Sequence, residues 1–141
     1  PPRSTLFPYT TLFRSMQFLV ENGITAGVMM APLLPGISDS EESINEVAAA
    51  AAEHKAQFLG ANVLFLKPGS KEWFMPMLRE SYPHLTTAYD KMYRKPYAPK
   101  EYTSMVLKAV DKARWEWGLQ VMEPTKDLRG RQRQLELALT A

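Results

Sequence analysis

Two short apolar runs, separated by a helical pattern, dominate the first half of the chain. Residues 24–30 (ITAGVMM) are apolar with little alternation, and residues 62–66 (NVLFL) have the same character. Strands covered on both faces of a parallel sheet contain such continuous runs. Between them, Ile44, Val47 and the alanines that follow recur at helical spacing and stop before Gly60. The pattern predicts two parallel strands joined by a crossover helix.

The second half of the chain is predicted to be mainly helical. Ser70 is a candidate N-cap, residues 83–93 form a short helix, and residues 101–118 carry the clearest apolar stripe, with Gly118 as terminator. Upstream, residues 16–23 have the pattern of the last two turns of a helix, with Gly23 in the left-handed position after its end. We therefore divide the chain into a strand–helix part (16–82), a helical extension (83–120) and a tail (121–141).

The first 15 residues, PPRSTLFPYTTLFRS, fit neither a helix nor a strand. They lack the basic start and apolar middle of a secretory signal. The codons CTC TTT CCC TAC ACG ACG CTC TTC CGA TCT encode LFPYTTLFRS, and this DNA resembles a common sequencing-library adapter. We therefore interpret residues 1–15 as a disordered, non-native leader without contacts to the core. The alternative is a natural disordered arm.

Charge and cysteine content exclude several classes of function. The chain has 17 Lys and Arg residues, of which Arg3 and Arg14 lie in the suspected leader, so 15 basic residues remain against 15 acidic ones. A neutral chain has no electrostatic footprint for nucleic acid or for an anionic membrane. Because there is no cysteine, disulfides, thiolate zinc sites and cysteine nucleophiles are excluded. No apolar run has membrane-spanning length, so we expect a cytoplasmic protein without a membrane partner.

Few polar residues have a spacing that indicates chemistry. His54 and His84 stand alone, and we interpret both as ordinary structural histidines. Asp39, Glu41 and Glu42 could hold a metal, but negative charge at a helix N-terminus explains them. Ser38 with Glu41 fits a capping box, so Ser38 is the expected cap of this helix. Tryptophans and tyrosines at helical spacing could stack on nucleobases, but we interpret them as core residues; they are Trp73, Tyr89, Tyr93, Tyr97, Tyr102, Trp115 and Trp117.

The loops after the two predicted strands are the better candidates for a site. In α/β sheets, ligands bind beyond the carboxyl ends of parallel strands. Here the corresponding loops are APLLPGIS (31–38) and LKPGS (66–70). Proline and glycine in such loops let the backbone approach a ligand closely, and they also occur as ordinary loop punctuation.

Several linked segments resemble the C-terminal part of radical SAM proteins of the spore photolyase-like, or "DNA repair photolyase", group. They are GVMMAPLLPGISD, the alanine-rich helix, NVLFLKPG, WFMPMLRESYP and the tyrosine-rich KMYRKPYAPKEY, which together cover roughly residues 16–120. The resemblance implies that the α/β unit is the remnant of a partial TIM-like barrel. It also implies a parent enzyme, similar to a DNA-repair lyase, that has nucleic acid as a partner.

In that family S-adenosylmethionine (SAM) binds across the carboxyl ends of the strands. By their place in the barrel, the residues implied to contact SAM are Pro32, Leu33, Pro35 and Gly36 after the first strand, and Leu66, Lys67 and Pro68 after the second. The family also has a C-x-x-x-C-x-x-C loop whose 4Fe–4S cluster cleaves SAM to a 5′-deoxyadenosyl radical.

The chain departs from the family in having no cysteine, so it cannot bind the cluster. We therefore expect a C-terminal fragment that contributes part of a SAM-binding wall, has no catalytic or metal-binding residue of its own, and is inactive without the missing N-terminal part of its barrel. The alternative is a small natural α/β interaction or binding module without catalysis. An in-frame cysteine triplet upstream would support the first hypothesis, and a stop codon and promoter just before Met16 the second.

Overall fold

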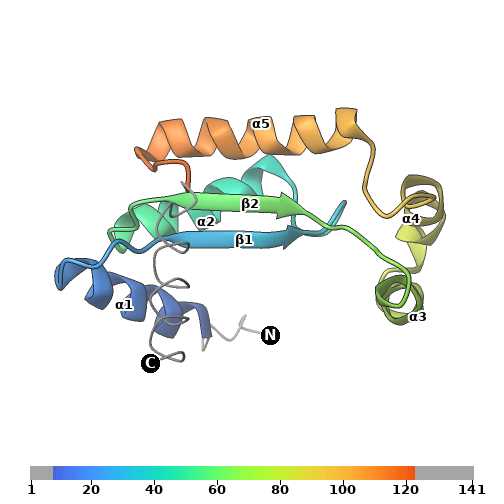
Figure 1. Ribbon diagram of the computed structural model, residues 1–141, viewed down its shortest axis with the longest axis horizontal. Coiled ribbons are helices and arrows are strands. Elements are labelled where there is room, and N and C mark those ends of the chain that lie inside the picture. The colour runs from blue at the N-terminus through green and yellow to red at the C-terminus, as the bar shows by residue number, and fades with distance from the viewer. Residues whose placement is uncertain (1–7, 123–141) are drawn as a thin grey trace, which may run out of the picture.

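The computed structural model describes residues 8–122 (Figure 1). Within this range the chain forms a mixed α/β structure with two strands and five α-helices, which confirms the predicted fold class at this level. In chain order the elements are α1 (Pro8–Glu21), β1 (Val28–Leu33), α2 (Glu41–Glu53), β2 (Leu59–Val63), α3 (Ser70–Ser81), a 3₁₀ turn (Pro83–Leu85), α4 (Thr86–Met92) and α5 (Lys100–Trp117).

Strands β1 and β2 pair in parallel and are joined by α2, as predicted. The register places Val28 opposite Leu59 and Leu33 opposite Val63, with an irregularity between Met30 and Leu33. The expected bounds were wrong: β1 begins after residue 24, and β2 begins before residue 62. Pairing with the partner strand decides where a strand starts, and an apolar run marks only which residues are buried. Gly60, expected to stop the helix, lies inside β2.

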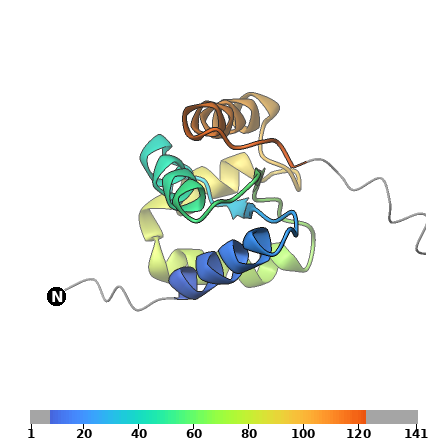
Figure 2. The same cartoon turned by 90° about the vertical axis from the view of Figure 1, so that its left-hand side faces the viewer.

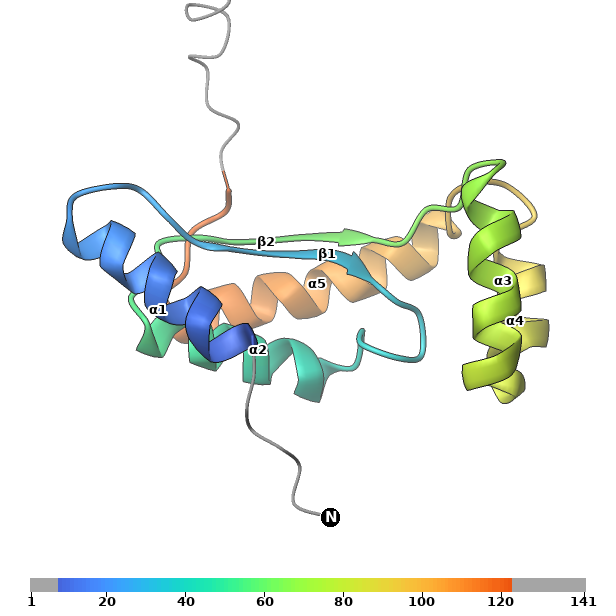
Figure 3. The same cartoon turned by 90° about the horizontal axis from the view of Figure 1, so that it is seen from below.

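Seen from below, helices α1, α2 and α5 lie on one side of the two strands, and within residues 8–122 no helix covers the other side (Figure 3). The end-on view shows α2 and α5 packed side by side (Figure 2). Their contact forms the first core cluster, which contains Leu33, Ile44, Ala48, Ala51, Leu59, Val106, Val110, Ala113 and Leu119. On the uncovered side, Met29 is 45% exposed and Asn62 is also exposed.

A second core cluster lies beyond the carboxyl ends of the strands, where α3 and α4 sit (Figure 1). It contains Leu64, Leu66, Met75, Leu78, Tyr89, Tyr93 and Ala98. Residues on both sides of the expected boundary after residue 82 therefore share one core. The main helical extension is α5, whose buried stripe and left-handed Gly118 cap (φ 66°) agree with the prediction. Of the expected tail, residues 123–141 lie outside the described part of the chain.

Helix α1 differs from the expected leader. It begins at Pro8 and runs without interruption through Met16 to Glu21, so residues 8–15 are helical. Phe13 packs against the first core cluster and stacks on the ring of His54, with 5.2 Å between ring centroids. The expectation that this segment makes no core contact is therefore wrong for Phe13. Residues 1–7 lie outside the described range.

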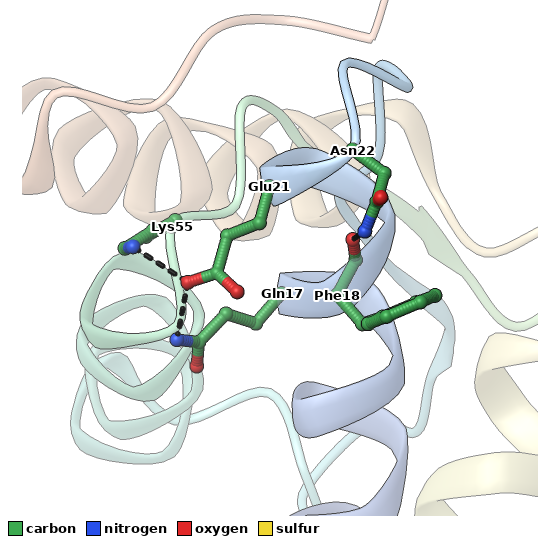
Figure 4. A network of polar contacts seen from close by, with 5 residues as sticks. All are labelled: Gln17, Phe18, Glu21, Asn22 and Lys55. Atoms are coloured by element: carbon green, nitrogen blue, oxygen red, sulfur yellow. Dashed lines mark hydrogen bonds and ion pairs between the residues drawn. The ribbon is translucent and has the colours of Figure 1, made fainter.

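Polar contacts fix the end of α1 against the end of α2 (Figure 4). Lys55 Nζ lies 2.6 Å from Glu21 Oε1, and Gln17 Nε2 donates to the same oxygen at 3.0 Å. The hydrogen bond from Lys55 lowers the pKa of the Glu21 carboxyl below its ordinary value. Gly23 follows with φ 79°, the left-handed conformation predicted for the residue after this helix.

Candidate functional site

The structure brings the two candidate loops together at one edge of the sheet. Leu64 N donates to Leu33 O at 2.9 Å, so the chain leaving β2 remains paired with the end of β1. Pro32 and Leu33 belong to β1 itself, and Pro35 and Gly36 follow in the loop. Because the strands are parallel, both loops emerge on the same side, where a ligand of an α/β sheet would bind.

The seven candidate residues differ in what they can offer a ligand. Pro32, Gly36, Lys67 and Pro68 are exposed. Leu33 and Leu66 are 4% and 3% exposed and belong to the first and second core clusters, and Pro35 is buried as well. The side chains of these three residues are therefore taken up by packing, which leaves their backbone as the part that could face a ligand.

The loop after β1 is held in shape by its own side chains. Gly36 has φ 71°, and its N–H donates to Asp39 Oδ1 at 2.7 Å. Leu34 N donates to Ser38 Oγ at 2.9 Å. The expected cap of α2 was therefore wrong by position: Ser38 serves the loop, while Ser40 caps the helix by accepting from Ser43 N.

The acidic cluster resolves into separate structural roles. Asp39 holds the loop, while Glu41 and Glu42 lie in the first turn of α2, as the charge pattern predicted. Glu41 pairs with Lys112 of α5 at 3.1 Å, and its hydrogen bond raises the pKa of Lys112. In the part of the chain that the structure describes, no group of three His, Asp or Glu side chains could hold a metal ion.

Three tyrosine hydroxyls that sequence reasoning did not assign to the site reach these strand ends. Tyr89 Oη donates to Pro35 O at 2.8 Å, and Tyr93 Oη donates to Leu64 O at 2.8 Å. Tyr102 Oη, on α5, donates to Asp39 Oδ2. The only signal in the sequence was the spacing of four between the first two tyrosines, which indicated one helical face and gave no information about the acceptors.

Burial keeps these phenols protonated. Removal from water raises the pKa of Tyr89 to about 12, with a smaller contribution from the negative charge of Asp39. The same cause raises the pKa of Tyr93 and of Tyr102, and the hydrogen bond to Asp39 adds to the effect on Tyr102. All three hydroxyls therefore remain hydrogen-bond donors to a higher pH than an exposed phenol would.

The interpretation of the aromatic residues as core holds for only some of them. Tyr89 and Tyr93 are each 1% exposed, and their rings lie 5.5 Å apart. Trp73, Trp115 and Tyr97 are 86%, 85% and 64% exposed, so for these the interpretation was wrong. A stripe at helical spacing does not distinguish a face that meets another element from one that meets water.

The two histidines make the contacts of structural residues. His54 Nδ1 lies 2.8 Å from Ala50 O at the end of α2, and its ring is covered by Phe13. His84 is exposed, with Tyr82 edge-on at 6.4 Å. In these contacts neither histidine ring touches any of the seven candidate residues. This agrees with the interpretation, made from the sequence, that neither histidine belongs to a site.

A groove of about 640 Å³ lies beside β1, between α1 and α2. Its lining is mainly apolar and includes Leu12, Met16, Met30 and Val47. Pro32 is one of its lining residues, so the groove reaches the candidate edge. Across residues 8–122, no helix combines the length and the apolar character needed to cross a membrane.

Comparison with known proteins gives relatives but no activity. The chain is 33% identical over 89 residues to uncharacterized proteins of Mycobacterium bovis and of two strains of Mycobacterium tuberculosis. The aligned region covers 62% of this chain and 26% of each relative, so the chain spans about a quarter of the length of the curated relatives it matches. No family model and no solved structure matches the chain.

Proposed function

We propose that this chain is the C-terminal part of a radical SAM enzyme of the spore photolyase-like group. In this proposal β1 and β2 are the last strands of a partial TIM-like barrel, and their carboxyl ends form part of a SAM-binding wall. The chain contributes binding surface and leaves catalysis to the rest of the enzyme. Its partner is the missing part of the barrel, and nucleic acid is a further partner of the complete enzyme.

One observation carries the proposal: the two loops that resemble the family meet at the carboxyl ends of a parallel strand pair. Helices cover one face of this pair, and within residues 8–122 no helix covers the opposite face (Figure 3). In a barrel of this kind helices lie outside the strands, side chains fill the inner face, and the ligand binds at the carboxyl ends of the strands. Exposed Met29 and Asn62 are placed on the face that would be internal. The greater length of the relatives supports a larger parent.

The candidate edge fits SAM better than it fits an iron–sulfur cluster. SAM, when bound, supplies the methionine and adenosyl groups on which radical chemistry depends, and a nucleoside of this kind needs backbone polar groups and a few small or apolar side chains. Gly36 and Pro68 leave room for it, and Lys67 supplies an exposed cation. A cluster requires thiolates, which this chain lacks, so no step of the reaction is assigned to these residues.

Two experiments test the proposal. Reading the DNA upstream of the Met16 codon in the source genome should show an in-frame C-x-x-x-C-x-x-C motif. In the protein itself, SAM added in millimolar excess to the ¹⁵N-labelled chain should shift the amide resonances of Gly36 and Lys67, while ATP at equal concentration should not. A stop codon immediately upstream, with no SAM-dependent shift, would contradict the proposal.

We infer a second candidate function from α1. Because α1 continues across residue 15 and Phe13 contacts the core, residues 8–15 belong to a helix of the fold. This favours a small natural α/β interaction module. Its groove between α1 and α2 would then bind an apolar partner. Deleting residues 1–15 separates the two candidates, because only the module needs them to fold.

A further inference from the structure

Three tyrosine hydroxyls connect the helical part of the chain to both strand ends; Tyr89 and Tyr93 are buried, and Tyr102 is half-buried. Tyr89 and Tyr93 come from α4 and its C-cap, and Tyr102 comes from α5. Their acceptors are Pro35 O, Leu64 O and the Asp39 carboxylate. Two of the acceptors lie in the loop after β1, and the third follows β2.

These hydrogen bonds continue into the loops themselves. Asp39 receives Tyr102 Oη on one oxygen and Gly36 N on the other, so α5 is connected to the Gly36 backbone through a single carboxylate. Leu64 accepts from Tyr93 and donates to Leu33 O, so α4 is connected through Leu64 to the end of β1. A movement of either loop would break at least one of these contacts.

Packing of the aromatic rings alone does not explain why these residues carry hydroxyl groups. Phe74 and Tyr93 surround the ring of Tyr89, with centroids 5.7 and 5.5 Å away, and a phenylalanine would fill the same space. A hydroxyl is costly in such a cluster unless it is paired. Each hydroxyl is in fact paired with an acceptor in a loop, which a purely apolar core would not need.

We propose that Tyr89, Tyr93 and Tyr102 are positioning residues, which set the separation and orientation of the two loops that form the ligand-binding edge. The inference deepens the proposed function and rests on it for the identity of the ligand, SAM. The positioning itself rests only on the three hydrogen bonds and on the burial of Tyr89 and Tyr93. The tyrosines act through the loop backbone and are not placed in contact with SAM.

The test measures amide hydrogen exchange, residue by residue, on the full 141-residue chain and on its Tyr89→Phe, Tyr93→Phe and Tyr102→Phe variants. The amide of Gly36 reports the first loop, and that of Leu64 reports the second. The amide of Val110, in the core between α2 and α5, reports global unfolding. Tyr97→Phe is the matched control, because Tyr97 is 64% exposed.

We expect each variant to lose about tenfold more protection at its own loop than at Val110, the size expected for one buried hydrogen bond. Tyr89→Phe and Tyr102→Phe should act at Gly36, and Tyr93→Phe at Leu64. The control, Tyr97→Phe, should change the protection of none of the three amides. Equal loss at all amides, or no loss at the loops, would overturn the inference.

A further substitution, at Asp39, keeps the test decisive if a tyrosine variant fails to fold. Asp39→Asn keeps the size of the side chain and removes the charge that strengthens the bond from Tyr102. It should reproduce the local loss at Gly36. The double variant Asp39→Asn with Tyr102→Phe should lose about as much protection at Gly36 as Asp39→Asn alone, because that change already weakens both hydrogen bonds that the carboxylate accepts. Additive losses would contradict the inference.

SAM titration distinguishes a positioning role of the tyrosines from a purely structural one, because a purely structural role would not change SAM binding. Tyr102→Phe should weaken the SAM-dependent shift of Gly36 several-fold, while Tyr97→Phe should leave it unchanged. If SAM shifts no amide of the unchanged chain, the proposed function fails and the exchange data still decide the positioning. If SAM binds all variants equally, the positioning inference fails and the proposed function stands.

Discussion

Tyr89 Oη donates a hydrogen bond of 2.8 Å to the backbone carbonyl of Pro35, 54 residues earlier in the chain. The tyrosine lies in the second core cluster, and the proline lies in the loop after β1. Proline has no N–H, so its carbonyl is the only backbone hydrogen-bonding group it offers. This contact joins the helical part of the molecule to the candidate site, and it has a measurable pH dependence.

Stability should fall at high pH because of Tyr89. Burial raises its pKa in the folded chain from an ordinary value of 10.0 to about 12. Below pH 10 both states are protonated and the contribution is fully present. As pH rises from about 10 to about 12, the unfolded chain loses the proton first and is stabilised, so the free energy of unfolding decreases.

Urea denaturation at several pH values in this window, with absorbance near 295 nm to follow phenolate formation, checks the expectation. Tyr89→Phe should show a smaller decrease of the urea midpoint with pH than the unchanged chain. Tyr97→Phe should retain the full decrease. If the Tyr89 variant and the unchanged chain had parallel pH profiles, the burial of this hydroxyl would be in doubt.

Removal of the Phe13 ring should destabilise the fold. The ring packs on the first core cluster and on His54, so Phe13→Ala should lower the free energy of unfolding by about 1–3 kcal/mol, below the full cost for a completely buried ring. Leu12→Ala is the adjacent control, since Leu12 is 64% exposed and should cost no more than about 0.5 kcal/mol.

Equilibrium urea denaturation measures both variants. A Phe13 variant as stable as the control would favour the interpretation of residues 1–15 as an inert leader. A chain that loses its cooperative transition when residues 1–15 are deleted would favour a natural module that includes them.

Replacement of two glycines by alanine should lower the free energy of unfolding by different amounts. A Cβ at Gly27 would collide with the backbone carbonyl of Phe58, which is fixed by its hydrogen bond to Val28 N. We expect Gly27→Ala to cost about 1–3 kcal/mol. A Cβ at Gly60 would instead collide with Met29 Sδ, near the end of a flexible side chain that can move aside.

Gly60→Ala should therefore cost less than Gly27→Ala in the same thermal or urea unfolding experiment. The comparison is informative because both sites belong to the strand pair: Gly27 directly precedes β1, and Gly60 lies within β2. The reverse order of stability would show that Met29 is held more firmly than its exposure of 45% indicates.

The uncovered face of the sheet should bind a hydrophobic dye. Met29 is 45% exposed there, and apolar surface of this kind binds dyes such as ANS and promotes association. Met29→Lys should lower ANS fluorescence and raise solubility with little change in unfolding free energy. Trp115→Lys, at an 85% exposed position on α5, is the control. Stronger lowering by the control would place the dye site elsewhere.

Much of the local structure could be predicted because the signals are short-range. Gly23 and Gly118 were predicted as helix terminators and have positive φ, since a terminating residue without Cβ is favoured there whatever surrounds it. The acidic start of α2 and the order of strand, helix and strand were likewise predictable. The strand bounds were not, because they depend on which residues of a distant strand lie opposite.

The sequence by itself determined the mixed α/β class, the parallel pair with its connecting helix, and the absence of thiolate chemistry, because periodicity, caps and composition are local or countable. Only the tertiary structure decided that Leu33 and Leu66 are buried while Gly36 and Lys67 face outward. It also decided that Tyr89, Tyr93 and Tyr102 meet loops far away in the chain. Burial and hydrogen-bond partners are properties of elements brought together in space, and no periodic pattern along one element contains them.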